Sequence, residues 1–337
     1  GNPLRYFFNN CLFDSGAPAV ANNHIFATMG LFNGVVGKYF LSSLSPTLNL
    51  QVGDVKSIPL ILNEENRINK LVKECIDISK EDWDSFETSW DFKVHPLVGE
   101  YSTIKEAFGQ WETKCNERYN RIVEVETELN RIYTSIYEMQ KQLSIEVNTK
   151  EISIYRADLK KDIKSLLSYA LGCIFGRYSS IIEKDGSIVH KNMSYYLGNI
   201  IPLTDKEYFK NDIVTLICNW IKDVYGEDYY EENITFIANA LQINGGIPNE
   251  VIRNYFINDF YADHCKMYST TSSGKRPIYW LFDSGKQNGF KALIYMHRYN
   301  ADTIGNLRVD YLHRMERIYE SEINRMQDTI DNSNNAR

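Results

Sequence analysis

The chain has 337 residues, of which 43% are hydrophobic and 24% charged, with only 19 Gly and 8 Pro, so a disordered or collagen-like chain is excluded. No uninterrupted apolar run approaches the roughly 18 residues of a membrane helix, so we expect a cytoplasmic protein without membrane contact. The formal net charge of −7 argues against a uniformly basic nucleic-acid-binding surface but allows a local basic patch.

Residues 1–62 have the pattern of the end of a small mixed α/β module. Aromatic residues among turn formers suggest short strands before residue 27, and a 3.6-residue apolar period predicts a helix over 29–44. Ser45-Pro46 ends this helix, because the residue before a proline is disfavoured in the helical region. The alternation of apolar and polar residues over 48–52 is typical of a half-buried strand.

Residues 63–102 begin with a short amphipathic helix and continue as an acidic linker. Its carboxylates alternate with large aromatic residues, and burial of such side chains is strongly favourable. We therefore expect the linker to be fixed to a core by four aromatic anchors. These are Trp83, Phe86, Trp90 and Phe92.

Residues 103–147 carry apolar residues at steps of three and four, without Pro or Gly after Gly109. This heptad stripe is typical of a coiled coil and predicts one long spacer helix. A single helix cannot bury its own stripe, so its partner is either another helix of this chain or a second molecule. A C-terminal spacer helix over 301–337 has a similar stripe at 302–330, and we expect an intramolecular antiparallel pair, because no association entropy is lost.

Residues 148–263 have the pattern of a helical domain, with a loop or hairpin over 183–199. We expect helices near 152–175, 208–225, 231–242 and 248–260. From 203 to 263 eleven acidic residues meet four basic ones, so this surface would repel phosphates. It should face away from nucleic acid or toward a protein partner.

Residues 264–300 predict a basic β-hairpin, because two β-prone runs flank a turn rich in Gly and Asn. Between His264 and Arg298 six basic residues accompany one acidic residue, which makes this the most positive stretch of the chain. We expect part of this set to contact DNA phosphates, while the aromatic residues of the hairpin pack as core. The candidate phosphate contacts are Lys275, Arg276, Lys286, Lys291 and Arg298.

Signatures of a self-contained enzyme are missing from the chain. It has no glycine-rich phosphate loop, no H-E-x-x-H and no G-x-S-x-G motif, and its six cysteines are widely spaced without a C-x-x-C pair. We therefore expect no catalytic residue, no metal and no cofactor in this chain. It starts with Gly1 rather than Met, and we expect it to be part of a longer protein.

Three segments resemble one known family. Residues 49–59, 82–90 and 276–299 are similar to the PglX family, the adenine-specific DNA methyltransferases of bacterial BREX phage-defence systems. Helix 29–44, followed by 53–59, also resembles the end of a target-recognition domain in type I specificity subunits. The resemblance implies an amino-terminal domain that binds S-adenosylmethionine and methylates adenine, followed by a DNA-recognition region to which this chain corresponds.

The family's catalytic Asn-Pro-Pro-Tyr loop has no counterpart here, so no catalytic residue is carried over. A recognition region needs polar side chains that reach base edges in double-stranded DNA. Further candidates for base or groove contact are Arg5, Asn9, Asn10, Lys38, Gln51 and Lys56. The alternative hypothesis is a protein-docking module for other BREX subunits, formed by the acidic 203–263 surface and the long helix.

These elements together predict a predominantly α, α+β fold. It would contain the small α/β recognition module, the long helical spacer, a helical bundle and the late β-hairpin.

Overall fold

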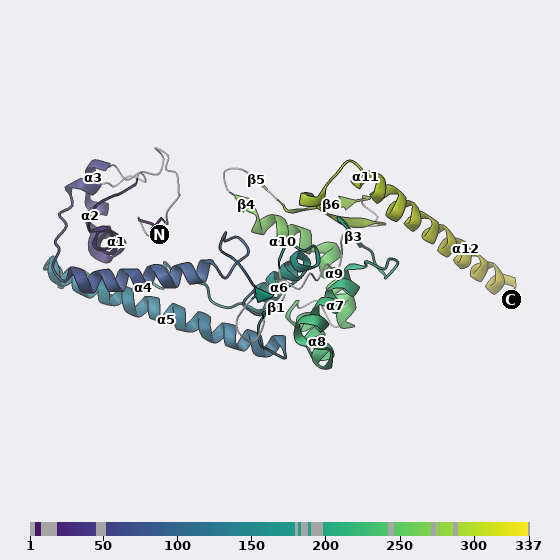
Figure 1. The fold of residues 1–337 in the computed structure, drawn as a ribbon, viewed down its shortest axis with the longest axis horizontal. Coiled ribbons are helices and arrows are strands. Elements are labelled where there is room, and N and C mark those ends of the chain that lie inside the picture. Colours follow the sequence, from purple (N-terminus) through teal and green to yellow (C-terminus); the bar gives the residue numbers. More distant parts are fainter. Residues whose placement is uncertain are drawn as a thin grey trace. The chain divides into compact units, whose positions relative to one another are not determined.

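The computed structural model describes residues 4–7, 19–44, 52–178, 181–182, 188–189, 198–241, 246–270, 274–275, 277–285 and 289–335. Of residues 181–182, 188–189, 269–270, 274–275 and 333–335 only the backbone is described. Unit 1 comprises Gly1–Asp84 and Glu112–Ala157, and unit 2 comprises Ser85–Trp111 and Asp158–Arg337. Helices predominate and a small antiparallel sheet accompanies them, which confirms the predominantly α, α+β fold (Figure 1).

All regular structure among the described residues of unit 1 is helical. Its first helices are α1 (Ile25–Asn33), α2 (Val35–Leu44) and α3 (Val52–Ser57). The helix predicted over 29–44 is interrupted at Gly34, where the side-chain oxygen of Asn130 accepts the N–H of Val35 at 3.0 Å and so caps α2. Gly37 allows α2 to approach α1 closely, because an added Cβ would lie 2.2 Å from the carbonyl oxygen of Leu31.

The described residues of 1–62 contain no strand. Val52, which the alternating pattern assigned to a strand, instead begins α3. Residues 48–51 and the aromatic run at 8–18 lie outside the described residues. A five-residue pattern is too short to distinguish a strand from a helical turn.

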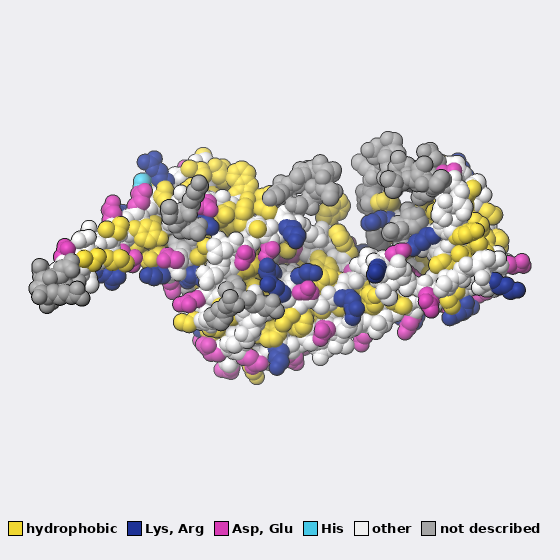
Figure 2. Space-filling view, turned by 180° about the vertical axis from the view of Figure 1, so that it is seen from behind, with side chains coloured by type: hydrophobic (Ala, Val, Ile, Leu, Met, Phe, Trp, Pro, Cys, Tyr) yellow, Lys and Arg dark blue, Asp and Glu magenta, His cyan; other side chains and the backbone are white. Residues whose placement is uncertain are grey.

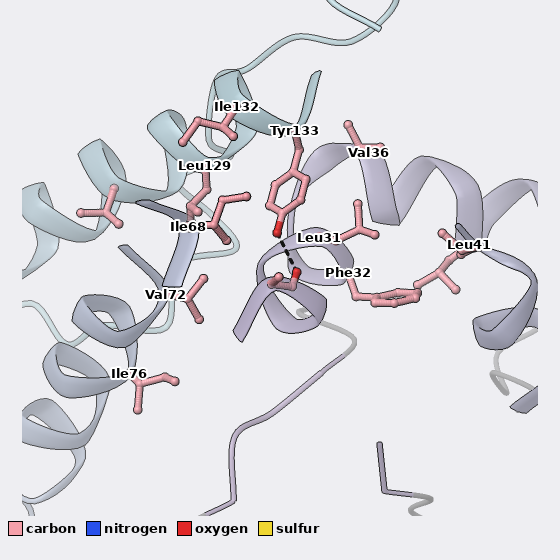
Figure 3. Close-up of a cluster of buried hydrophobic side chains, with 13 residues drawn as sticks. Leu31, Phe32, Val36, Leu41, Ile68, Val72, Ile76, Leu129, Ile132 and Tyr133 are labelled. Atoms are coloured by element: carbon pink, nitrogen blue, oxygen red, sulfur yellow. Dashed lines mark hydrogen bonds between the residues drawn. The ribbon is translucent and has the colours of Figure 1, made fainter. Parts of the chain in front are cut away.

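The core of unit 1 lies among α1, α2, α4 (Glu65–Trp83) and the C-terminal half of α5 (Ile104–Ile136) (Figure 3). Leu31, Val36 and Ile68 are fully buried there. Tyr133 fills the same core, and its hydroxyl donates to the carbonyl oxygen of Ala27 at 2.6 Å, so this large side chain leaves no unpaired polar atom.

Four ion pairs join α4 to α5, and three of them are spaced at seven-residue intervals. Arg67 pairs with Glu128, Glu74 with Arg121 at 2.5 Å, and Glu81 with Lys114 at 2.6 Å. The partner numbers fall on one helix as they rise on the other, so the two helices are antiparallel.

The partner of the long spacer helix is therefore α4 and not the predicted helix 302–330. Val125, Leu129 and Ile132 of α5 share a core with Ile68 and Val72 of α4. The sequence interpretation treated the start of 63–102 as a short helix, whereas α4 extends over 19 residues and covers the stripe.

The long helix is also shorter than predicted. It ends at Ile136 rather than near 147, and Glu138, with φ 54°, adopts the left-handed conformation that ends a helix.

Unit 2 contains a bundle of five helices among its described residues. They are α6 (Leu159–Ile174), α7 (Ile213–Tyr225), α8 (Tyr230–Leu241), α9 (Pro248–Asn258) and α10 (Phe260–Met267). Four of these helices were predicted, and most of their ends agree with the prediction to within two residues. The exceptions are the first residues of α6 and α7, which are 159 and 213 instead of the expected 152 and 208. Helix α10 was not predicted, and it crosses the expected boundary between residues 263 and 264.

A buried ion pair fixes the start of α7. Asp212 is fully buried and caps the helix by accepting the N–H groups of Val214 and Thr215 at 2.9 and 3.1 Å. The guanidinium of Arg253 on α9 donates two hydrogen bonds to the same carboxylate, at 2.5 and 2.9 Å. The helix expected from residue 208 therefore begins at Ile213.

The sheet of unit 2 has the order β3-β7-β6, with both neighbours antiparallel. The predicted strands are β6 (Tyr279–Asp283) and β7 (Lys291–Tyr295), and β3 (Ile200–Leu203) was not expected. Pro202 within β3 is tolerated because β3 lies at the edge of the sheet.

The C-terminal helical region consists of α11 (Thr303–Asn306), a π-helical turn (Leu307–Leu312) and α12 (His313–Asn335). Leu307 and Met315 are buried in a core with residues of β3 and β7. Farther along α12, Ile323 and Met326 are 64% and 56% exposed, and apolar side chains are visible along this helix (Figure 2).

Only two of the four aromatic side chains that were expected to anchor the linker pack against a core. Phe86 packs edge-on against Trp111 and Phe92 packs edge-on against Tyr169, with ring centres 6.5 and 5.7 Å apart. Trp83 and Trp90 are 58% and 99% exposed, so these two expectations are wrong.

Candidate nucleic-acid interface

The structure divides the predicted hairpin region 264–300 into two hairpins. β4 (Ser269–Thr270) pairs antiparallel with β5 (Gly274–Lys275), and β6 pairs with β7. Lys275 lies opposite Ser269 in the first hairpin. Arg276 and Lys286 lie outside the described residues, so Lys291 and Arg298 are the candidate phosphate contacts whose side chains can be assessed.

Lys291 is a structural side chain. It is only 9% exposed, and its Nζ donates to the carbonyl oxygen of Ile257 at 3.1 Å and lies 3.7 Å from Asp283, its cross-strand neighbour. The ammonium group thus joins the end of α9 to the sheet. Because it is buried and already engaged, it is poorly placed to contact a phosphate.

Arg298 is also engaged within unit 2. Its guanidinium donates to the carbonyl oxygen of Gly198 at 3.3 Å and lies 5.6 Å from the ring centre of Tyr295. It packs beside Gly176, where an added Cβ would lie 3.1 Å from Nη2. Arg298 therefore positions the chain that enters β3.

A second short hairpin follows α6. β1 (Ile181–Ile182) pairs antiparallel with β2 (Ile188–Val189). Helix α6 ends in a Schellman motif in which Gly176, with φ 70°, occupies the left-handed position and the N–H of Arg177 donates to the carbonyl oxygen of Gly172 at 2.7 Å. This turn fixes the direction in which the chain leaves α6 toward β1.

Arg177 links the bases of the β1–β2 and β4–β5 hairpins. Its Nη1 donates to the hydroxyl of Tyr268 at 3.1 Å, and Tyr268 directly precedes β4. The guanidinium carbon also lies 4.7 Å from the ring centre of Tyr178 and 5.6 Å from that of Tyr268. Cation–π contacts and a hydrogen bond thereby hold the two hairpin bases together.

Glu87 supports this linkage from the loop before α5. The carboxyl is 6% exposed and accepts the hydroxyl of Ser168 at 2.8 Å and that of Tyr268 at 3.4 Å. Burial raises the pKa of Glu87, while Ser168, Arg177 and Tyr268 lower it. The buried carboxyl thus joins α6 to the base of β4.

His264 on α10 completes the cluster as a neutral side chain. Its Nε2 accepts the N–H groups of Ile278 and Tyr279 at 2.9 and 3.2 Å, which fixes the chain before β6. Burial, followed by the charge of Arg177, lowers the pKa of His264 to about 4. We define Glu87, Arg177, His264, Tyr268 and Tyr279 as the hairpin-base cluster.

Three buried atoms of the hairpin-base cluster have no hydrogen-bond partner among the described residues: Glu87 Oε1, His264 Nδ1 and the Tyr279 hydroxyl. Since His264 Nε2 is an acceptor, the neutral ring carries its proton on Nδ1. The cluster therefore offers an acceptor at Glu87, a donor at His264 and a hydroxyl at Tyr279 that can donate or accept. Its chemistry suits holding polar groups in place.

The candidate base contacts belong to unit 1. Arg5 and Lys56 are exposed, whereas Lys38 pairs with Glu151 at 2.7 Å. Asn9, Asn10 and Gln51 lie outside the described residues. The candidate base contacts and the candidate phosphate contacts thus belong to different units, since Lys275, Lys291 and Arg298 are part of unit 2.

Sequence reasoning missed the hairpin-base cluster as a group. Its members come from four separated stretches of chain, with His264 and Tyr268 one turn apart at the end of α10, and they form no motif. One local signal was available, since Gly176 before Arg177-Tyr178 is typical of a helix end that redirects the chain.

Neither a metal-binding group nor a membrane helix emerges from the described part of the chain. It contains no group of three His, Cys, Asp or Glu side chains placed to bind a metal ion. No helix there combines the length and apolar character required to span a bilayer.

Comparison with known proteins identifies two similar sequences, whereas no protein-family model matches the chain. The adenine-specific methyltransferase PglX of Lacticaseibacillus casei (strain Zhang) is 35% identical over 352 residues, which cover 99% of this chain and 29% of that protein. The adenine-specific methyltransferase BrxX of Escherichia coli O9:H4 (strain HS) is 31% identical over 373 residues, covering 98% of this chain and 30% of that protein. The chain thus spans about three tenths of the length of these relatives.

Proposed function

Since this chain is PglX-like over nearly its whole length, we propose that it forms the DNA-recognition and spacer region of an adenine-specific DNA methyltransferase in a bacterial BREX phage-defence system. The catalytic domain, with its S-adenosylmethionine, would belong to the remaining part of a longer cytoplasmic protein. Double-stranded DNA is the proposed partner.

The observation that carries the recognition role is the linkage between the two hairpin bases in unit 2. A protein that binds DNA must present cations at fixed positions along the phosphate backbone. The Arg177–Tyr268 hydrogen bond and the buried Glu87 hold the base of the hairpin that contains Lys275. This support comes from rigid helices, which suits a recognition surface.

Among the basic candidates, the proposed phosphate contacts are Lys275, Arg276 and Lys286. Lys291 and Arg298 are proposed to position the backbone instead, because both side chains bond to carbonyl oxygens of unit 2. Arg5, Asn9, Asn10, Lys38, Gln51 and Lys56 remain proposed base or groove contacts, and Lys38 would first have to leave Glu151.

The spacer role is supported by the α4–α5 pair. A helix of 33 residues that is braced by a second, antiparallel helix resists bending better than a single helix. Such a pair can maintain a fixed separation between elements attached to its ends.

The proposal is tested by measuring the affinity of the whole chain for duplex DNA at several salt concentrations. Affinity should fall steeply with salt, because binding releases counterions from the phosphates. Lys275→Glu combined with Arg276→Glu should weaken binding to all sequences alike and reduce the slope of log affinity against log salt by about 2.

Lys105→Glu combined with Lys160→Glu is the matched control, since both lysines are exposed in unit 2 and the change in net charge is the same. The control should bind nearly as well as the unmodified chain. Salt-independent affinity, or no binding at low salt, would contradict the proposed function.

The second candidate function, docking of other defence-system subunits, is favoured by the exposed apolar side chains of α12. Ile323 and Met326 lie on a helix face that no described residue buries. Co-purification with such subunits that persists in the Lys275→Glu, Arg276→Glu variant and is lost in Ile323→Glu would support docking.

A further inference from the structure

Trp90 is the most exposed large apolar side chain of the chain's described part, at 99%. It belongs to the 82–90 segment that resembles the PglX family, yet neither the hairpins nor the helical spacer accounts for it. An indole that gains nothing from its own fold suggests a contact with another molecule.

The turn that carries Trp90 is held firmly on both sides. The N–H of Ser89 donates to the carbonyl oxygen of Phe86 at 2.9 Å, and the N–H of Asp91 donates to the hydroxyl of Ser89 at 3.1 Å. Ser89 itself is buried, so the backbone on either side of the indole has a defined path. Presenting the side chain in this way reduces the conformational entropy lost on binding.

The same turn is attached to the hairpin-base cluster. Phe92, two residues after Trp90, packs edge-on against Tyr178 with ring centres 5.3 Å apart, and Tyr178 lies beneath Arg177. Glu87, three residues before Trp90, accepts the hydroxyl of Tyr268. The elements that hold the two hairpin bases therefore also hold the Trp90 turn.

The chain on either side of Trp90 favours a nucleobase over a protein surface as its partner. Within 85–111, all described, no other large apolar side chain is exposed, whereas protein interfaces normally present a contiguous apolar patch. The exposed neighbours Thr88, Asp91 and Lys93 are polar. A flat indole with polar neighbours matches a base, which has an apolar face and polar edges.

We propose that Trp90 stacks on a nucleobase of the bound DNA. This inference rests on the proposed function and adds a specific contact to it. An enzyme that modifies adenine must extrude the base from the duplex, and this leaves an unstacked position that an aromatic side chain can fill. Such stacking tolerates any base, because every base offers a π-face.

The experiment uses the whole chain and a duplex that contains one unpaired 2-aminopurine, a fluorescent adenine analogue. Stacking on the indole should quench its emission when the chain binds. Trp90→Ala should remove the quenching and weaken affinity between about 5-fold and about 150-fold, as expected for the loss of one base–aromatic stack. Trp90→Phe should retain most of both effects.

Trp280→Ala and Trp83→Ala are matched controls, because both indoles are exposed, at 52% and 58%. Both should behave like the unmodified chain, and the thermal unfolding midpoint of Trp90→Ala should be unchanged, since its side chain supports no core. If Trp90→Ala binds DNA with the same affinity, salt dependence and quenching as the unmodified chain, the stacking inference is wrong and the proposed function is unaffected.

If the unmodified chain does not bind DNA, both the stacking inference and the proposed function are wrong. If Trp90→Ala abolishes self-association in sedimentation and leaves DNA binding unchanged, Trp90 is a protein contact and the stacking inference is wrong.

Discussion

One ion pair of unit 1 and one ion pair of unit 2 lie in opposite surroundings. Between α4 and α5 of unit 1, Arg121 and Glu74 pair with 48% and 36% of their side chains exposed. Between α7 and α9 of unit 2, Arg253 is 12% exposed and Asp212 fully buried. The two Arg–carboxylate pairs should therefore make very different contributions to the free energy of unfolding, because one is exposed and the other buried.

The physical reason is solvent screening. Exposed ion pairs contribute about 0–1 kcal/mol, because water and salt weaken them and two long side chains must be ordered. Removing one partner of a buried pair costs about 3–5 kcal/mol, because the remaining charge has lost its water and its counter-charge. We therefore expect the Arg121–Glu74 pair to add little to the stability of unit 1, and the Arg253–Asp212 pair to matter strongly for unit 2.

The largest effect is expected for Arg253→Met. This change leaves Asp212 buried without its partner and should lower the free energy of unfolding of unit 2 by about 3–5 kcal/mol. Urea unfolding followed through the buried Trp220 of this unit measures it. Adding Asp212→Ser, which retains a capping oxygen, should recover part of the loss; no recovery would mean that the charge is not the cause.

The apolar core of unit 1 comes next. Ile68→Ala removes a fully buried side chain from the α4 face and should cost about 2–5 kcal/mol in urea unfolding followed by circular dichroism. Ile323→Ala on α12 removes the same atoms from an exposed position and should change stability by less than about 0.5 kcal/mol. Equal effects in the two variants would contradict the expected role of this core.

Glu87 sharpens the comparison through pH. Burial raises its pKa in the folded state, so between about pH 4.5 and that raised value the folded chain holds a proton that the unfolded chain has lost. The contribution of this group to stability should therefore fall as the pH rises through this window. Glu87→Gln, which cannot ionise, should lose this slope when urea unfolding is compared from pH 4 to 8; parallel curves would contradict the prediction.

The smallest effect is expected at the surface of the helix pair. Arg121→Ala should lower the free energy of unfolding of unit 1 only slightly, and added salt should reduce the difference further. A loss of several kcal/mol, measured by the same urea unfolding, would show that the helix pair depends on its ion pairs after all.

How far the sequence allows prediction depends on the length of each pattern. The stripe over α5 and the two strand runs of β6 and β7 are long or well bounded, and both were found. The partner of α5 was wrong, because an apolar stripe specifies that a face is buried but not which other stripe covers it. The start of α7 was missed because its cap, Asp212, depends on Arg253 about forty residues later.

The candidate site shows the same limit more strongly. The sequence revealed where basic residues concentrate, and Lys275 does lie in a hairpin. It could not show that Lys291 and Arg298 turn inward to carbonyl oxygens, or that Trp90 turns outward, since a residue's type indicates its preferred but not its actual burial. Glu87, Arg177 and Tyr268 meet only through the tertiary fold.

The order of charge signs along the α4–α5 pair has a consequence for its alignment. Sliding the helices by one heptad in one direction would set Arg67 against Arg121, and sliding them in the other would set Glu74 against Glu128. Each slip would break the three pairs spaced at heptad intervals. It would bring together one like-charge pair and one opposite-charge pair, Glu74 with Lys114 in the first case and Glu81 with Arg121 in the second, so the observed register keeps the most attraction. Residues that add little to stability can thus still determine how far one helix extends past the other, and so the length of the strut they form.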